Sequence, residues 1–249
     1  MIVGFFSGLF GVGGGFIVIP LLTLLLGFDL KRASATSLVV IVITAAAGVV
    51  GFAVHGGVVW VPALALSIGS VIGSYVGARL LKYIPSVYLM WGFAALLVVL
   101  AVRLMFDASE QGSGNVVTSW PALLGMLALG LGAGLLSGLL GVGGGILVVP
   151  LLVIAFGLTN VEAKGTSLVM MIPAGITGTV VNLKNKFVDV HAGVLIGCVA
   201  AAVSYAGVAV AVVMPDVLSN ILFALLMLYT AAQFVLRAIR SGKPPRPLD

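Results

Sequence analysis

Long apolar runs separated by short polar joints make up most of the chain. Each uninterrupted run is about 20 residues long, enough for a helix to cross a hydrocarbon core of about 30 Å. Two further regions, 1–27 and 120–157, are equally apolar but are broken by glycine. The pattern predicts an all-α polytopic membrane protein, and its clear spans are 33–54, 60–81, 86–106, 163–183, 190–213 and 217–236.

The composition narrows the class of protein further. Hydrophobic residues are 61% of the 249 residues and charged residues only 8%, with a mean hydropathy of +1.31. A soluble domain carries about 25% charged residues, so lipid must cover most of this surface. The single cysteine, Cys198, excludes disulfide and cysteine-rich metal frameworks, and we expect neither a metal nor a cofactor. No basic run is interleaved with aromatic residues, so no nucleic-acid partner is expected.

The two halves of the chain are copies of one unit. The string Gly-Val-Gly-Gly-Gly at Gly11 recurs at Gly141, an offset of 130 residues. The same offset, without a gap, relates Ser7-Gly-Leu to Ser137-Gly-Leu, Pro20 to Pro150, Thr36-Ser-Leu-Val to Thr166-Ser-Leu-Val, Ser74-Tyr75 to Ser204-Tyr205, and Pro85 to Pro215. Matches at one fixed offset indicate an internal duplication.

A polar stretch divides the two copies. It predicts four segments, in order the first transmembrane repeat, an extracytoplasmic linker, the second transmembrane repeat and a cytoplasmic tail. Their bounds are 1–106, 107–118, 119–237 and 238–249.

Basic residues indicate how the copies are related. In the first half they lie in the first and third joints, at Lys31, Arg32, Arg79 and Lys82. In the second half the equivalent joints hold only Lys164, and the others hold Lys184, Lys186, Arg237, Arg240, Lys243 and Arg246. Because basic loops prefer the cytoplasm, the second copy is expected to lie upside down relative to the first. A parallel arrangement would split the basic residues almost evenly between the two sides.

This charge pattern predicts two inverted repeats, each a glycine-broken helical hairpin followed by three transmembrane helices. Inverted repeats are a common plan of secondary transporters. We expect a multi-pass protein of the inner (plasma) membrane with its C-terminus in the cytoplasm.

The two glycine-rich turns are the strongest candidates for a site. Glycine exposes backbone N–H groups, and the helix that restarts after each turn points its positive dipole end at the turn. Such a turn in a membrane interior is typical of an anion site. The alternative is close helix crossing through small residues, which we favour for Gly69, Gly73 and Gly77. The predicted substrate-binding glycines are Gly11, Gly13, Gly14, Gly15, Gly141, Gly143, Gly144 and Gly145.

Hydroxyl side chains open the helix after each hairpin, at Thr36, Ser37, Thr166 and Ser167. They are predicted to bind substrate, by donating to an anion or by offering oxygen to a cation. The alternative is helix capping and hydrogen bonding to carbonyl groups of the same helix.

Acidic residues lie only in joints and in the tail, and no mid-span carboxylate is present for a proton relay. No acid pair, histidine cluster or Ser-His pairing indicates catalysis, so no catalytic residues and no enzyme are expected.

The paired motifs resemble the TauE/SafE family of membrane permeases over nearly the whole chain. The resemblance rests on two stretches, Ser7 to Pro20 and Ala35-Thr-Ser-Leu38, and on their second copies, Ser137 to Pro150 and Gly165-Thr-Ser-Leu168. It implies export of an anion such as sulfite, sulfoacetate or a related organosulfonate. The chain departs from the family in its very short first arm before Gly11.

Together these observations predict a secondary transporter of small sulfur-containing anions, sulfite or a short organosulfonate. Alternating access would place the substrate between the two glycine-rich hairpin tips. The alternative is an anion channel, or a permease for another small organic anion. The expected partners are the small anionic substrate and the lipid bilayer, with a homodimer left open.

Overall fold

The computed structural model describes residues 1–81, 83, 86–106 and 119–241, and these form helices joined by short loops. The helices are α1 (Ile2–Phe10), α2 (Gly15–Leu25), α3 (Leu30–Val54), α4 (Trp60–Leu80), α5 (Ser86–Phe106), α6 (Trp120–Leu140), α7 (Gly145–Phe156), α8 (Asn160–Lys184), α9 (Val190–Val213) and α10 (Asp216–Ser241). Helix α10 continues past residue 237, where the second repeat was predicted to end. The predicted linker 107–118, Lys82, Pro85 and residues 242–249 of the predicted tail lie outside the described residues.

The all-α polytopic prediction is confirmed. Within the described residues, six helices are long and apolar enough to cross a membrane. They are α3, α4, α6, α8, α9 and residues 216–236 of α10. Helix α6 is long enough to span alone, so the hairpin of the second half has one full-length arm and one short arm, α7. In the first half both arms are short, because α1 has 9 residues where α6 has 21.

Local sequence explains where the central helices begin. Helices α3 and α8 have 25 residues each and start 130 positions apart, so this pair keeps the offset of the duplication at both ends. Thr159 and Glu162 form a capping box at the start of α8, in which each side chain bonds the other residue's backbone N–H. Helix α9 starts at Asp189, whose carboxylate accepts a hydrogen bond from the Ala192 N–H.

The Asp189 side chain also joins two helices of different repeats. Arg32, near the start of α3, forms a salt bridge of 2.8 Å with it. The hydrogen bond from the Ala192 N–H, and then the Arg32 guanidinium, hold the pKa of the Asp189 carboxyl below its ordinary value. Helices α3 and α9 therefore begin at the same end of the molecule.

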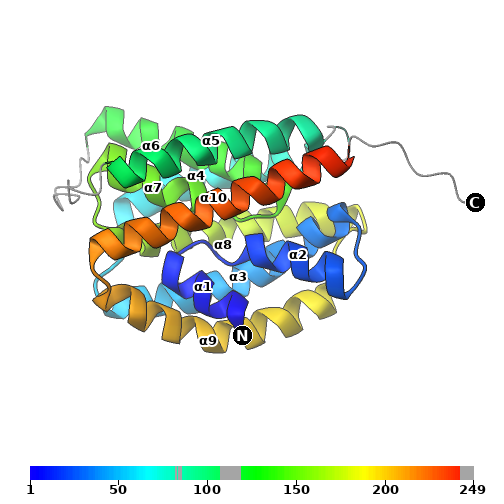
Figure 1. Ribbon diagram of the computed structural model, residues 1–249, viewed down its shortest axis with the longest axis horizontal. Coiled ribbons are helices and arrows are strands. Elements are labelled where there is room, and N and C mark those ends of the chain that lie inside the picture. The colour runs from blue at the N-terminus through cyan, green and yellow to red at the C-terminus, as the bar shows by residue number, and fades with distance from the viewer. Residues whose placement is uncertain (82, 84–85, 107–118, 242–249) are drawn as a thin grey trace, which may run out of the picture.

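Helices of one repeat pack on helices of the other. The most extensive contact is between α4 and α6, and the equivalent pair, α9 and α1, packs in the same way. Figure 1 shows α5 and α10 lying side by side along the molecule, with α8 and α3 behind α10 and α1. The two repeats are thus interlocked, and neither forms a separate bundle.

Small residues make the α4–α6 contact possible. A Cβ atom at Gly69, Gly73 or Gly77 would overlap a carbonyl oxygen of α6, and one at Gly134 would overlap the Ser70 oxygen. The helices therefore touch backbone to backbone. This confirms the packing interpretation of Gly69, Gly73 and Gly77.

Candidate functional site

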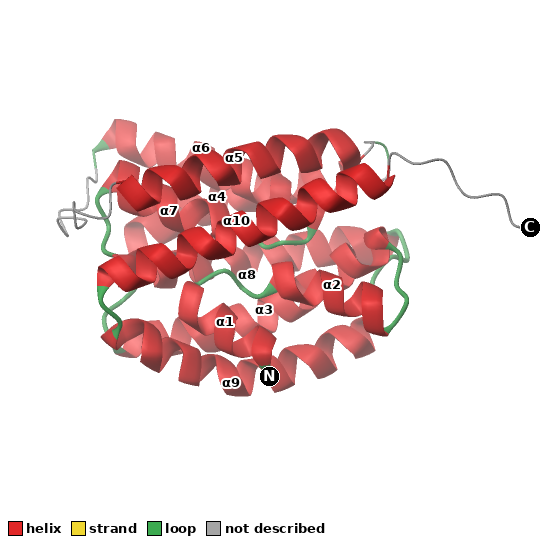
Figure 2. Ribbon diagram, viewed as in Figure 1, coloured by secondary structure: helices red, strands yellow, loops and turns green. Residues whose placement is uncertain are grey.

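The two glycine turns lie inside the bundle. Figure 2 shows the α1–α2 connection as a loop within the body of the molecule, away from the loops at its ends. Three glycines of the first turn have left-handed backbone angles, with φ of 65° at Gly11, 73° at Gly13 and 76° at Gly14. Their equivalents in the second turn, Gly141, Gly143 and Gly144, do the same. Only glycine adopts this backbone at little cost, which explains the composition of both turns.

The two turns touch each other. A Cβ atom at Gly15 would lie 2.5 Å from the Gly141 oxygen, and one at Gly145 would lie 2.8 Å from the Gly11 oxygen. These two contacts are equivalent under the 130-residue offset, so each turn meets the helix start that follows the other turn in the same way. Glycine at these positions lets the N-terminal ends of α2 and α7 approach the opposite turn.

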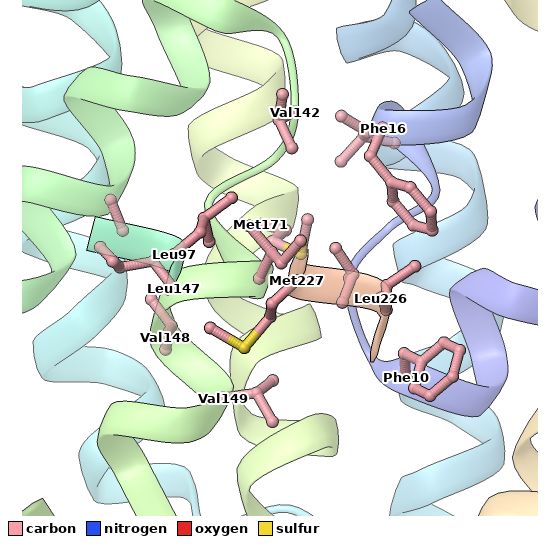
Figure 3. Packing of buried hydrophobic residues seen from close by; sticks show 14 of the residues in the cluster. Phe10, Phe16, Leu97, Val142, Leu147, Val148, Val149, Met171, Leu226 and Met227 are labelled. Carbon is pink, nitrogen blue, oxygen red and sulfur yellow. The ribbon is translucent and has the colours of Figure 1, made fainter. Parts of the chain in front are cut away.

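Apolar side chains close the space beside the turns. Figure 3 shows Met171, Val142 and Phe16 among the cluster at this point of the molecule. Met171 and its repeat equivalent Ile41 are both at most 1% exposed, and the Met171 methyl group lies against Gly13 and Gly143. Val12 and Val142, within the turns, are also buried. This conformation is therefore closed around the glycine turns.

The predicted serines join one repeat to the turn of the other. The Ser37 hydroxyl donates to the Gly141 carbonyl oxygen at 2.6 Å, and the Ser167 hydroxyl to the Gly11 oxygen at 2.8 Å. Each serine also lies within hydrogen-bonding distance of a carbonyl of its own helix, as the capping interpretation anticipated. We call Ser37–Gly141 and Ser167–Gly11 the cross-repeat serine bonds.

The predicted threonines also bond to the other repeat. Thr36 Oγ1 accepts from the backbone N–H of Asp189 at 3.0 Å, and Thr166 Oγ1 accepts from that of Val59 at 3.1 Å. Both threonines are buried. Since Asp189 precedes α9 and Val59 precedes α4, each threonine fixes the start of a helix in the other repeat. Bonds between residues 107 to 153 positions apart could not be read from local sequence.

The structure adds one residue that sequence reasoning did not assign to a site. Lys164 is 1% exposed, and it is the charged side chain among the buried polar residues of the described part of the chain. A Cβ atom at Gly11 would lie 2.7 Å from the Lys164 Cα and Cβ atoms, so this lysine packs on the first glycine turn. The sequence offered one signal for it: Lys164 is the basic residue of the second half that lies in the joints where the first half, but not the second, gathers its basic residues.

A polar cavity of about 460 Å³ lies between α4 and α8, at the end of α8. Its lining is Tyr75, Arg79, Tyr83, Val181, Lys184 and Asn185. The Arg79 guanidinium stacks over the Tyr75 ring, 4.3 Å from the ring centroid. Two cationic side chains at one cavity favour the approach of anions to this end of the molecule.

Metal ligands are not gathered anywhere in the described residues, where no group of three His, Cys, Asp or Glu side chains could hold an ion. The candidate site consists of backbone amides, hydroxyls and one buried ammonium group. That set of groups suits an anion.

Removing one cross-repeat serine bond is expected to destabilise the protein measurably. Ser37→Ala and Ser167→Ala should each lower the free energy of unfolding by about 1 kcal/mol, because a buried carbonyl loses its partner. Thr230→Val is the control, since the Thr230 hydroxyl bonds only within α10. Thermal unfolding in detergent measures the difference. Equal losses in all three variants would contradict a special role for the cross-repeat bonds.

Comparison with known proteins identifies a protein family that this chain resembles. The family model described as "Sulfite exporter TauE/SafE" matches residues 1–104 and 126–248. A probable membrane transporter protein of Bacillus subtilis, YdhB, is 29% identical over 76% of this chain and 78% of its own length. Probable membrane transporter proteins of Haemophilus influenzae and Methanocaldococcus jannaschii are 30% and 31% identical. The first match covers 70% of this chain and 67% of the relative, and the second covers 62% and 59%. No solved structure matches significantly.

Proposed function

Because the chain belongs to the sulfite exporter TauE/SafE family and is a multi-pass membrane transporter, we propose that it moves a small sulfur-containing anion, sulfite or a short organosulfonate, by secondary transport. The observation that carries this proposal is the meeting of two glycine turns inside the bundle. Helices α2 and α7 begin at these turns, so two positive helix ends face one region. The first N–H groups of a helix have no partner within it and bind anions readily.

Inverted repeats are part of the proposal. Their support is the order of helix starts: α3 begins beside the start of α9, whereas α8 begins beside the start of α4. Since α4 follows α3 through a short loop, α3 and its copy α8 begin at opposite ends of the bundle. In Figure 1 the α2–α3 connection and the end of α10 lie at one end of the molecule. That end carries Lys31, Arg32, Lys184 and Lys186, and we assign it to the cytoplasm of the inner membrane.

This geometry supports alternating access as the mechanism of the proposed transport. Ser37 lies seven residues into α3, about 10 Å from its start, and Ser167 lies equally far into α8 from the opposite end. One cross-repeat serine bond therefore faces each side of the membrane. Opening the bond on one side while the other stays closed would expose the turns to one compartment at a time. The freed hydroxyls and N–H groups would then bind the substrate.

A panel of anions tests the substrate class. The detergent-purified protein is heated with sulfite, sulfate, thiosulfate, sulfoacetate, taurine, acetate or chloride. A ligand at about 100 times its Kd should stabilise the protein by roughly 2.7 kcal/mol. We expect this with sulfite or sulfoacetate, together with saturable uptake into proteoliposomes.

Three results would overturn the proposal. The absence of stabilisation by every sulfur anion would remove the substrate class. Uptake that does not saturate would favour an anion channel, and stabilisation by acetate alone would favour a permease for another organic anion.

A further inference from the structure

Lys164 places a positive charge in the interior of the protein, where burial of a charge is costly. Its side chain is buried at the second turn of α8, inside a helix long and apolar enough to span the membrane. A cation there is costly unless something neutralises it, and such residues usually face a partner or a pathway. Lys164 forms no salt bridge within 4.0 Å among the described residues, where Arg32–Asp189 is the ion pair present.

The partners of Lys164 are polar, and the acid that acts on its charge, Asp216, forms no salt bridge with it. Lysine Nζ donates to the Ser219 hydroxyl at 2.8 Å. The nearest acid, Asp216, accepts instead from the Asn160 side-chain amide at 2.9 Å. Next to Ser219, Asn220 is 6% exposed, and its side-chain oxygen is buried without a hydrogen-bond partner. The buried ammonium thus has no salt bridge, and the amide oxygen of Asn220 has no donor.

This polar cluster adjoins the first glycine turn. Lys164 packs on Gly11, and the Ser167 hydroxyl reaches both the Gly11 and the Lys164 carbonyl oxygens. Helix α10 covers the end of α1 through the edge-to-face contact of Phe10 and Phe223, whose ring centroids are 5.6 Å apart. Figure 3 shows Phe10 with Leu226 and Met227 of α10 on this side of the turn. A movement of α10 away from α1 would expose the turn and the ammonium together.

The other repeat lacks the cluster. The residues equivalent to Lys164, Asp216, Ser219 and Asn220 are Ser34, Ser86, Leu89 and Met90. The space lined by Ser34 and Met90 is only about 10 Å³ and is otherwise mostly apolar. In the first repeat, mostly apolar side chains therefore occupy the position that Lys164 occupies in the second. Packing of the fold therefore does not require a lysine at position 164.

We propose that Lys164, with Ser219, forms the oxyanion-binding subsite of the transport pathway and holds the charged oxygens of a sulfite or sulfonate group beside the first glycine turn. This inference rests on the proposed function and names the charged group that selects its substrate. A hydrogensulfite ion, or the sulfonate group of a larger anion, carries one negative charge that pairs with the ammonium and lowers the cost of burying both charges. The Ser219 hydroxyl, which accepts from Lys164 in the closed structure, then donates to another oxygen of the anion.

Substitution of Lys164 tests the subsite in the full-length protein. Sulfite and sulfoacetate affinities are measured by thermal stabilisation for the unsubstituted protein, Lys164→Gln, Lys164→Arg and the control Lys186→Gln, which removes an equal charge from an exposed loop. Lys164→Gln should weaken binding of both anions at least tenfold, since a charge-assisted hydrogen bond is lost. Lys164→Arg should retain most of the affinity, and Lys186→Gln all of it.

The melting temperature without ligand separates this role from a structural one. Removing a buried charge that has no salt bridge should leave that temperature unchanged or raise it, whereas loss of a structural contact would lower it. If Lys164→Gln does not fold, Lys164→Met carries the same test with a side chain of similar length. Undiminished affinity in the folded variant would overturn the subsite and leave the proposed function intact. Failure of the unsubstituted protein to bind either anion would instead overturn the proposed function.

Discussion

Replacing Gly134 by leucine is expected to destabilise the protein strongly, whereas the same change two residues earlier, at Gly132, is expected to be tolerated. A Cβ atom at Gly134 would overlap the Ser70 carbonyl oxygen, but one at Gly132 would have no neighbour within 4 Å. Both residues lie in α6, so the loss of a helical glycine is the same in both variants. The difference isolates the contact between α4 and α6.

The loss of stability expected for Gly134→Leu depends on whether side chains or whole helices must shift to make room. Ordinary overpacking of a core costs about 1–3 kcal/mol and is relieved by shifts of side chains. At Gly134 the obstacle is backbone, so the helices must separate and we expect a loss of more than about 3 kcal/mol. That corresponds to a fall in melting temperature of roughly 10 °C. Detergent-solubilised yield and thermal unfolding measure it, and similar behaviour of the two variants would contradict the close crossing.

Gly144→Leu is expected to reduce transport to background while leaving the protein inserted in the membrane. Gly144 has φ of 71°, and a Cβ atom there would lie 2.7 Å from the Ala133 oxygen. The substitution would displace the second glycine turn from its place against the first. The proposed anion site would then lose one of its two helix ends.

The matched control is Gly27→Leu. Gly27 has a similar φ of 64°, but a Cβ atom there would have no neighbour within 4 Å. Both variants therefore carry the same left-handed strain of about 1–2 kcal/mol, and only Gly144→Leu disturbs the turn. Uptake of sulfite into proteoliposomes compares them at equal amounts of inserted protein. Normal transport by a folded Gly144→Leu variant would contradict the role of the turns.

The two predicted serines lie where the site was expected, but their hydrogen-bond partners were not predicted. The sequence assigned Ser37 and Ser167 to the same predicted site as the glycine turns, and in the structure each serine lies against a glycine turn. Their partners, however, are the carbonyl groups of the opposite turn, 104 and 156 residues away. A serine that favours helix capping by local pattern therefore also joins two repeats. Their binding of substrate stays a prediction that depends on the opening of these bonds.

The sequence by itself determined the helices and the duplication. A bilayer requires every backbone polar group to be satisfied within its segment, so apolar runs of sufficient length become helices whatever their neighbours are. Gly11 and Gly141 end helices because consecutive residues determine a left-handed turn. Such properties depend on residues close in the chain, and a repeat at one fixed offset makes them visible twice.

Only the tertiary structure decided which helices meet and what becomes buried. The α4–α6 and α1–α9 contacts join different repeats, and their choice depends on the shape of whole helix faces. From the sequence, Lys164 was a basic residue in a joint, whereas the structure buries its side chain against Ser219 of α10. The physical reason is that burial is a property of everything packed around a residue, and for Lys164 those neighbours come from both ends of the chain, at Gly11 and at Ser219.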